Sequence, residues 1–146
     1  MALHHLQCMK RIASVAFLFC VSLPAATNPF DPVRGSWQGA VQFESTESAE
    51  AHAVGLMTAH IGADGEIDAI HPNGCKLSGV IAMQSVNFYQ LDARTQGCSY
   101  APLNRRWSGY VAYKQGDRVL AISGRSSYTG ADGKFRQLDF SGTLQR

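Results

Sequence analysis

The chain has 146 residues, of which 45% are hydrophobic and 16% are charged, and its formal net charge is +2. This length gives room for one domain, and the balance of residue types excludes a disordered chain. Fourteen glycines and five tyrosines favour a β protein.

The N-terminal segment is typical of a secretory signal peptide. Lys10 and Arg11 precede an apolar run at residues 12–23, and small residues follow it; this order directs export and cleavage. The run of 12 residues is shorter than the roughly 20 that span a bilayer, so we expect no stable membrane insertion. We expect residues 1–26 to be the signal peptide, with Met9 as the true start. The mature protein would then be periplasmic or secreted in a bacterium.

Loss of this segment makes the mature protein formally neutral. It removes two of the thirteen basic residues and leaves eleven, against eleven acidic residues. Nucleic acids and anionic membranes both select a basic surface, so neither is expected as a partner.

Two of the four cysteines, Cys75 and Cys98, remain in the mature chain. A pair of cysteines in an exported protein favours a disulfide. The other two, Cys8 and Cys20, lie in the discarded segment. Lipid anchoring of Cys20 is an alternative, but lipoproteins place a small residue before that cysteine, and Phe19 stands there.

Apolar residues alternate with polar ones along most of the mature chain, which is typical of strands with one buried face. Pro29 and Pro32 exclude a helix in residues 27–34, so we expect an extended lead before a domain at 35–146. The polar stretch 44–50 favours a loop or one helical turn. The predicted strands span residues 35–43, 53–61, 66–70, 76–84, 88–94, 106–114, 118–128 and 135–145.

A short phrase recurs in five of the predicted strands: a large apolar residue, then Ser or Gln, then Gly. Because residues two apart share a face of a strand, each phrase puts a bulky side chain and a bare glycine on the same side. Such glycines let a sheet bend sharply, which predicts a small closed barrel. The phrases are Trp37-Gln38-Gly39, Leu77-Ser78-Gly79, Trp107-Ser108-Gly109, Ile122-Ser123-Gly124 and Phe140-Ser141-Gly142.

The tetrapeptide Gly-Ala-Asp-Gly occurs at residues 62–65 and again at 130–133, each time between predicted strands. These residues favour hairpin turns, so we expect two hairpins built alike. In the middle of the chain, a register that pairs Met83 with Tyr89 brings the two mature cysteines together. The second duplicated turn sets the pairs Ile122 with Gly142, Gly124 with Phe140, and Arg125 with Asp139.

Eight short strands joined by mostly tight turns predict an all-β fold, a single antiparallel up-and-down barrel. Eight strands enclose an interior that side chains just fill, or that holds one small ligand. Gly35-Ser36-Trp37, at the start of the first strand, is similar to the Gly-x-Trp start of lipocalins and avidins, the calycin barrels. This resemblance implies a calycin-like barrel in which Arg146 covers Trp37.

A longer resemblance covers most of the domain. Asn-Gly-Cys-Lys-Leu-Ser-Gly at 73–79, Asn-Phe-Tyr-Gln-Leu at 87–91 and Gly-Cys at 97–98 resemble a group of small exported bacterial proteins of unknown function. That resemblance transfers no activity.

No pattern in the mature chain is typical of a catalytic or metal site. The register places His60 opposite Asp68 and puts His71 on the other face, so we expect no shared metal and no cofactor. The sequence gives little support to the hypothesis that Cys98 is a nucleophile with His71 as its base, because an exported cysteine is more often in a disulfide. The serines lack a Gly-x-Ser-x-Gly elbow. Carboxylates are grouped only in the acidic loop at Glu44, Glu47 and Glu50, which we expect to be solvated. We therefore predict a non-enzymatic protein.

The first binding role that fits is a protein-binding module of the bacterial envelope, of the inhibitor or immunity type. Its partner would be an envelope or secreted protein. The candidate surface is the loop after Cys98, which carries residue types enriched at interface hot spots: Tyr100, Leu103, Arg105 and Arg106. An ordinary exposed loop is the alternative interpretation.

The second role is the binding of a small apolar ligand, as in lipocalins. A purely structural envelope protein is a third interpretation. The ligand pocket would be lined by Trp37, Met57, Met83, Tyr89 and Trp107, and the alternative is that these side chains fill a dry core.

We expect the exported protein to begin just after Ala26, because the basic, apolar and small segments are complete at that point. Intact-mass measurement of protein from the periplasmic fraction will show the loss of residues 1–26. A mass that retains Lys10 and Arg11 would contradict this prediction.

Overall fold

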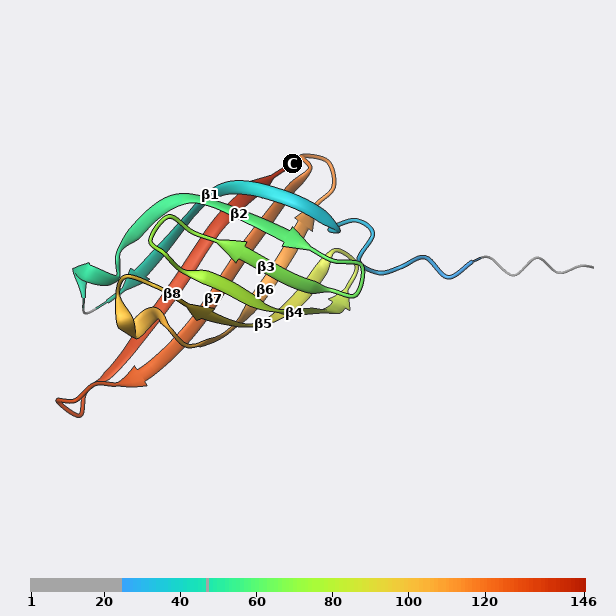
Figure 1. Ribbon diagram of the computed structural model, residues 1–146. Coiled ribbons are helices and arrows are strands. Elements are labelled where there is room, and N and C mark those ends of the chain that lie inside the picture. The colour runs from blue at the N-terminus through green and yellow to red at the C-terminus, as the bar shows by residue number, and fades with distance from the viewer. Residues whose placement is uncertain (1–24, 47) are drawn as a thin grey trace, which may run out of the picture.

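The chain forms a closed antiparallel barrel in which each strand pairs with the next and the last pairs with the first (Figure 1). The computed structural model describes residues 25–46 and 48–146. The predicted all-β, up-and-down barrel of eight strands is confirmed. In chain order the strands are β1 (Gly35–Ser45), β2 (Ala53–Ile61), β3 (Glu66–Ile70), β4 (Lys76–Ser85), β5 (Phe88–Gln96), β6 (Arg106–Lys114), β7 (Val119–Thr129) and β8 (Phe135–Gln145).

Some sequence predictions fall on residues outside the described part of the chain. They concern the signal peptide as far as residue 24, the start at Met9, the two cysteines Cys8 and Cys20, and the acidic Glu47.

The predicted strand ranges differ from the observed ones by at most two residues at either end. The largest differences are at the C-terminal ends of β1 and β5, which continue to Ser45 and Gln96. The polar stretch after β1 contains one short 3-10 segment, η1 (Ala49–Ala51). Alternation therefore locates the strands well, because every strand has one face in the core.

The lead before β1 was expected to be extended, but residues 29–33 form turns. The Asn28 side-chain oxygen accepts a hydrogen bond from the Phe30 amide at 2.9 Å, and the Phe30 carbonyl accepts one from the Val33 amide at 2.9 Å. The Phe30 ring packs under Tyr89, with 5.9 Å between ring centroids. Two prolines exclude a helix, but they do not exclude a turn that buries an aromatic ring.

The two Gly-Ala-Asp-Gly hairpins are built alike, as predicted. In both, the last glycine has a positive φ, +82° at Gly65 and +76° at Gly133. Both also place a hydrogen bond from the first glycine to the residue after the turn, Gly62 to Glu66 at 2.8 Å and Gly130 to Lys134 at 2.9 Å. The predicted pairs in the second hairpin are confirmed: Ile122 with Gly142, Gly124 with Phe140, and Arg125 with Asp139.

The large residues of the five repeated phrases are all buried in the interior. Three rings meet at the centre, where Phe140 lies 5.5 Å from Phe43 and 5.1 Å from Trp107 between ring centroids. Burying one large apolar side chain stabilises a fold by about 1.5–3 kcal/mol. These side chains belong to one contiguous cluster that runs through the barrel.

A Cβ added at any glycine of the five phrases would lie within 2.3 Å of an atom of a neighbouring strand. A Cβ added at Gly124 would come within 2.3 Å of the Phe140 ring, so the predicted contact of small with large is confirmed there. At Gly142 the expected contact with the Ile122 side chain is replaced by a backbone contact. A Cβ at Gly142 would lie 2.3 Å from the Ala40 carbonyl oxygen of β1.

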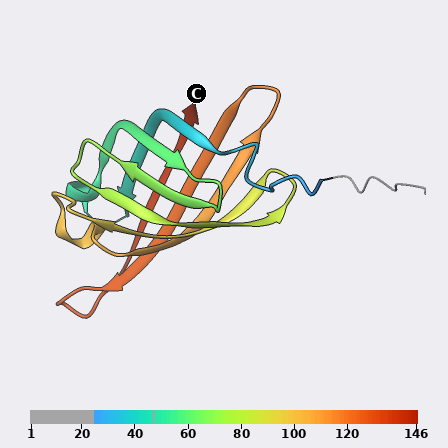
Figure 2. The ribbon, with the colours of Figure 1, turned by 45° about the vertical axis from the view of Figure 1, so that its right-hand side comes forward.

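The two ends of the barrel differ. The lead end, on the right in Figure 1, holds the lead and the short turns after β2, β4 and β6. The loop end, on the left, holds η1, the 71–75 turn, the loop 97–105 and the turn of the β7–β8 hairpin. This hairpin projects beyond the rest of the barrel in both Figure 1 and Figure 2.

We expect Val at Gly124 or Gly142 to destabilise the fold by about 1–3 kcal/mol, because the side chain would overpack a closed interior. The Gly142→Val cost should be the larger, since backbone cannot rotate aside as a ring can. Thr at Ser123 or Ser141, whose side chains point outward, should cost well under 1 kcal/mol. Equilibrium urea unfolding of the four variants measures these differences. Equal costs for the serine and glycine changes would show that the inward and outward faces are exchanged.

Candidate functional site

The loop end is fastened by the disulfide between Cys75 and Cys98, as predicted. The cysteines are 23 residues apart, and closing a loop of that length stabilises a fold by about 3 kcal/mol in the chain-entropy model. Asn73 also holds the two segments together. Its side chain accepts a hydrogen bond from the Cys75 amide at 3.0 Å, and its backbone carbonyl accepts one from the Ser99 hydroxyl at 2.7 Å. The loop 97–105 is therefore anchored at its start.

Leu103 lies inside this loop end, and its predicted place on a partner-binding surface is wrong. Its side chain is only 1% exposed, because the 3-10 segment η2 (Ala101–Leu103) turns it inward over the core. The Leu103 carbonyl accepts a hydrogen bond from the buried Thr95 hydroxyl, which in turn accepts one from the Trp107 indole at 2.8 Å. Leu103 therefore closes the loop end of the barrel.

Arg105 joins the loop to the projecting hairpin. Its guanidinium carbon lies 4.2 Å from the centre of the Tyr128 ring, and its Nη1 donates a hydrogen bond to the Ser127 carbonyl at 3.1 Å. Its Nε donates to the Pro102 carbonyl within the loop itself. Burial lowers the pKa of Arg105, but a guanidinium stays charged at any physiological pH. The arginine thus places a fixed positive charge between two segments.

Tyr100 completes this junction. A side-chain hydrogen bond with Tyr100 raises the pKa of Tyr128, and Tyr100 itself is half-buried against the core cluster. Of the four residues predicted for a partner surface, the structure therefore brings Tyr100 and Arg105 together.

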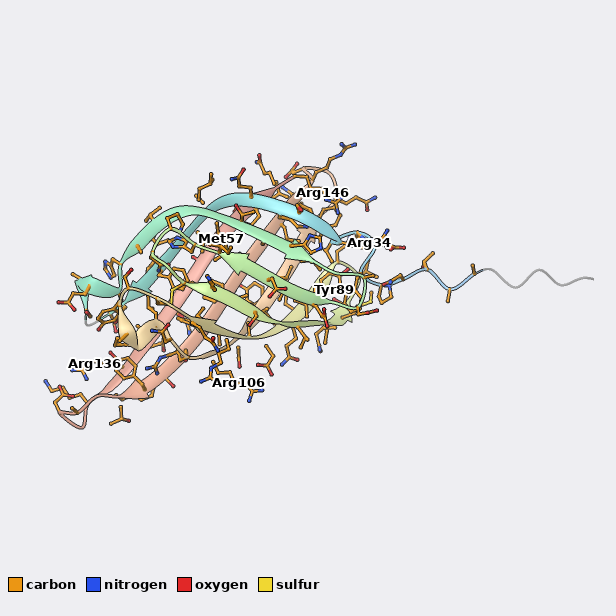
Figure 3. The ribbon with its side chains drawn as sticks, in the orientation of Figure 1. Arg34, Met57, Tyr89, Arg106, Arg136 and Arg146 are labelled. Atoms are coloured by element: carbon orange, nitrogen blue, oxygen red, sulfur yellow. A yellow bond between two sulfur atoms is a disulfide. The ribbon has the colours of Figure 1, made fainter. Side chains whose placement is uncertain are left out.

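Arg106 does not join them, although it is the next residue along the chain. It points away from the barrel on the outer wall of β6 (Figure 3), and its Nε donates to Asp92 at 2.8 Å. Through this bond it lowers the pKa of Asp92, and Asp92 raises the pKa of Arg106. Successive residues of a strand point to opposite sides, which separates the two arginines.

The β7–β8 hairpin supplies residues that sequence reasoning missed. β7 pairs with β6 only as far as Arg125, but with β8 it continues to Thr129. The projecting part carries Phe135, which is 64% exposed, and Arg136. The alternating pattern predicts only that both residues lie in a strand. It does not predict their exposure, because that depends on where the neighbouring strands β6 and β1 end.

The tip of this hairpin is stiffened by an ion pair. Arg136 donates to both carboxylate oxygens of Asp132, at 2.8 and 2.7 Å. This contact lowers the pKa of Asp132 to about 2. Arg136 lies at the projecting end of the molecule in Figure 3. We call the residues of this loop and hairpin the end surface. Tyr100, Arg105, Tyr128 and Arg136 lie on the side that faces the loop, and Phe135 projects from the opposite face of the hairpin, because successive strand residues point to opposite sides.

Four of the five residues predicted to line a ligand pocket, Trp37, Met57, Tyr89 and Trp107, are buried. They belong to the packed core cluster. Burial also raises the pKa of Tyr89, whose hydroxyl donates to the Pro29 carbonyl at 2.7 Å. The placement of Met83 beside them is wrong, because Met83 is 43% exposed. It lies next to an irregularity in the β4–β5 pairing, at the end of the hairpin, where the wall runs past the core.

The histidines are separated, as the register predicted. His60 lies opposite Asp68 on the outer wall, whereas His71 is buried and its Nε2 bonds the Val41 carbonyl at 3.0 Å. Within residues 25–46 and 48–146, no three His, Cys, Asp or Glu side chains are grouped as a metal ion would require. The same part of the chain contains no helix that is long and apolar enough to cross a membrane.

The lead end has the contact that the calycin resemblance implied. The Arg146 guanidinium carbon lies 4.5 Å from the centre of the Trp37 ring. The Trp37 indole donates to the Val33 carbonyl at 2.6 Å. Together with the closed strand order, these contacts make the chain a small barrel consistent with a calycin-like fold. No family model, curated protein or solved structure matches the chain.

We expect Arg105→Ala to loosen the projecting hairpin, because it removes both the ring contact and the hydrogen bond to Ser127. Contacts of these kinds are each worth roughly 1 kcal/mol, so amide hydrogen exchange in residues 126–137 should become about tenfold faster. Arg106→Ala is the matched control and should leave exchange in the hairpin unchanged. Equal effects of the two variants would mean that Arg105 does not hold the hairpin.

Proposed function

We propose that this protein is an exported, non-enzymatic binding protein of the bacterial envelope that acts on a protein partner, as an inhibitor or immunity protein does. The observation that carries the proposal is the end surface. It combines Tyr, Phe and Arg side chains, the types enriched at interface hot spots, on segments that extend beyond the barrel.

The end surface is also pre-organised for binding. Its loop is anchored by the Cys75–Cys98 disulfide, and its hairpin is held by Arg105 and by the Arg136–Asp132 ion pair. A surface that is already ordered loses less conformational entropy when a partner binds. An exposed aromatic at the tip, Phe135, is suited to enter a cleft of the partner.

Several features support an envelope location. The disulfide is compatible with an oxidising compartment, and the N-terminal residues have the order of a signal peptide. The resemblance of the middle of the chain to small exported bacterial proteins points the same way.

The alternative of a small apolar ligand inside the barrel has less support. Trp37, Met57, Tyr89 and Trp107 occupy the interior with other core side chains, and Leu103 and Phe30 cover the two ends. A ligand of the lipocalin type would have to displace packed side chains, and each large side chain taken from the core costs several kcal/mol.

We expect Phe135→Ala, and Tyr100→Ala separately, to weaken binding of the partner at least about tenfold, because truncation of an interface anchor typically costs 1–2 kcal/mol or more. The partner is first captured from an envelope extract on immobilised wild-type protein, then purified, and its Kd is measured by calorimetry. Val54→Ala, an exposed apolar change on the wall of β2, is the matched control and should change the Kd less than twofold. Unchanged binding by both end-surface variants would refute the proposed surface.

A further inference from the structure

A groove of about 540 Å³ runs over the outer wall of the barrel, across β6, β7, β8 and β1. It is separate from the end surface and from the packed interior. Its volume falls within the roughly 300–1,000 Å³ typical of small-molecule sites. Its lining includes the outward side chains of Glu44, Tyr110, Ser123, Arg125, Asp139 and Ser141.

Glycines form part of the floor of this groove. Gly109 and Gly124 lie directly opposite each other on β6 and β7, and both line the groove. Neither can be replaced without a clash: a Cβ on Gly109 would lie 2.0 Å from the Ser123 carbonyl oxygen. Both missing side chains would point into the barrel, so what lines the groove here is the strand backbone between the outward side chains of β6 and β7.

The polar groups of the groove supply both donors and acceptors. Both oxygens of Asp139 are occupied, one by Arg125 Nε at 2.7 Å and the other by Gln137 Nε2 at 2.9 Å. Glu44 lies opposite Asp139 on β1, and no ion pair between described residues includes it. Arg125 lies on the other side of Asp139 from Glu44, on β7. It retains N–H groups that are not bonded to Asp139, since a guanidinium has five.

Two serine hydroxyls extend this polar row. Ser123 and Ser141 are paired across β7 and β8, and each hydroxyl both donates and accepts hydrogen bonds. The groove therefore presents an anion, a cation and neutral hydroxyls within one row of strands. A ligand that is itself rich in hydroxyl groups matches such a mixture best.

An exposed pair of aromatic rings borders the groove on the side of β5 and β6. Tyr110 lines it and is 46% exposed, and Phe88 beside it is 39% exposed. Their rings are stacked, with 5.4 Å between centroids and 29° between planes. Stacked rings held open to water offer a flat apolar platform next to hydrogen-bonding groups.

We propose that this groove binds a neutral oligosaccharide of β-1,4-linked hexose units. In such sugars the ring hydroxyls lie around the edge and each face carries C–H groups, so one unit stacks on Tyr110 of β6. The units that follow lie across β7 and β8 towards β1, where their edges meet the serines, Arg125 and Glu44. An anionic sugar is disfavoured, because the groove has two carboxylates, Glu44 and Asp139, against one guanidinium. This site is independent of the proposed protein-binding role.

The test is a titration of isotope-labelled mature, oxidised protein with cellotetraose and chitotetraose, followed by NMR amide shifts. We expect saturable shifts confined to the outer residues of β6, β7, β8 and β1 with at least one of these sugars. Tetragalacturonate, which is anionic, should bind at least about tenfold more weakly. Absence of saturable shifts with both neutral sugars, shifts centred on another face, or equal binding of tetragalacturonate would overturn the proposal.

Three variants sharpen the test. Tyr110→Ala should weaken binding about tenfold or more, whereas Tyr110→Phe, which keeps the ring, should retain most of the affinity. Phe135→Ala removes an exposed ring at the end surface and should change the sugar Kd less than twofold. The amide spectrum of each variant reports whether it is folded, and the shift map of the wild-type protein does not depend on any variant. Unchanged binding by folded Tyr110→Ala would refute the platform.

Discussion

The close approach of strands at glycine positions is the constraint on which this barrel depends. It is clearest at the seam where β1 meets β8, which has a glycine on each side. A Cβ on Gly39 would lie 2.0 Å from the Thr143 carbonyl oxygen, and one on Gly142 would lie 2.3 Å from that of Ala40. A side chain at either position would push the first and last strands apart. Those contacts allow the sheet to close, which buries the core and leaves no free strand edge along this seam.

A barrel packed this tightly leaves its outer surface as the part that is open to a ligand or a partner. With eight strands, the interior is only wide enough for side chains, and here Trp37, Phe43, Trp107 and Phe140 take that space. What remains for recognition is the end of the barrel, where loops vary, and the wall, where outward residues are not needed for packing. At both the end surface and the wall groove, exposed aromatic rings stand beside charged side chains.

Most of the fold could be predicted from the sequence because local and global signals agree. Alternation located the strands, the duplicated turn set the β7–β8 register, and the pairing of Met83 with Tyr89 brought the cysteines together. Two of the errors, at Leu103 and Met83, have a common cause. Leu103 and Met83 lie at the ends of the strand ladder, where a neighbouring segment, and not alternation, decides whether a side chain is covered.

The candidate site was harder to predict than the fold for the same reason. Tyr128, Phe135 and Arg136 become an exposed surface only because β6 and β1 stop pairing before the β7–β8 hairpin ends. No local pattern in residues 126–137 contains that information. The wall groove likewise joins Tyr110, Arg125 and Glu44, which are far apart in the sequence and meet only through the closed strand order.

The projecting hairpin also leaves part of one strand edge outside the closed sheet. Past Arg125 the outer side of β7 has no partner in β6, and an unpaired strand edge is a template for pairing with another molecule. The Arg105 side chain blocks this edge, because its Nη1 occupies the Ser127 carbonyl that a foreign strand would need. A charged group at that position also makes dry stacking of two such edges costly. Arg105 therefore covers the strand edge at the point where the closed sheet ends and the two-stranded ribbon begins, and such a contact disfavours edge-to-edge pairing.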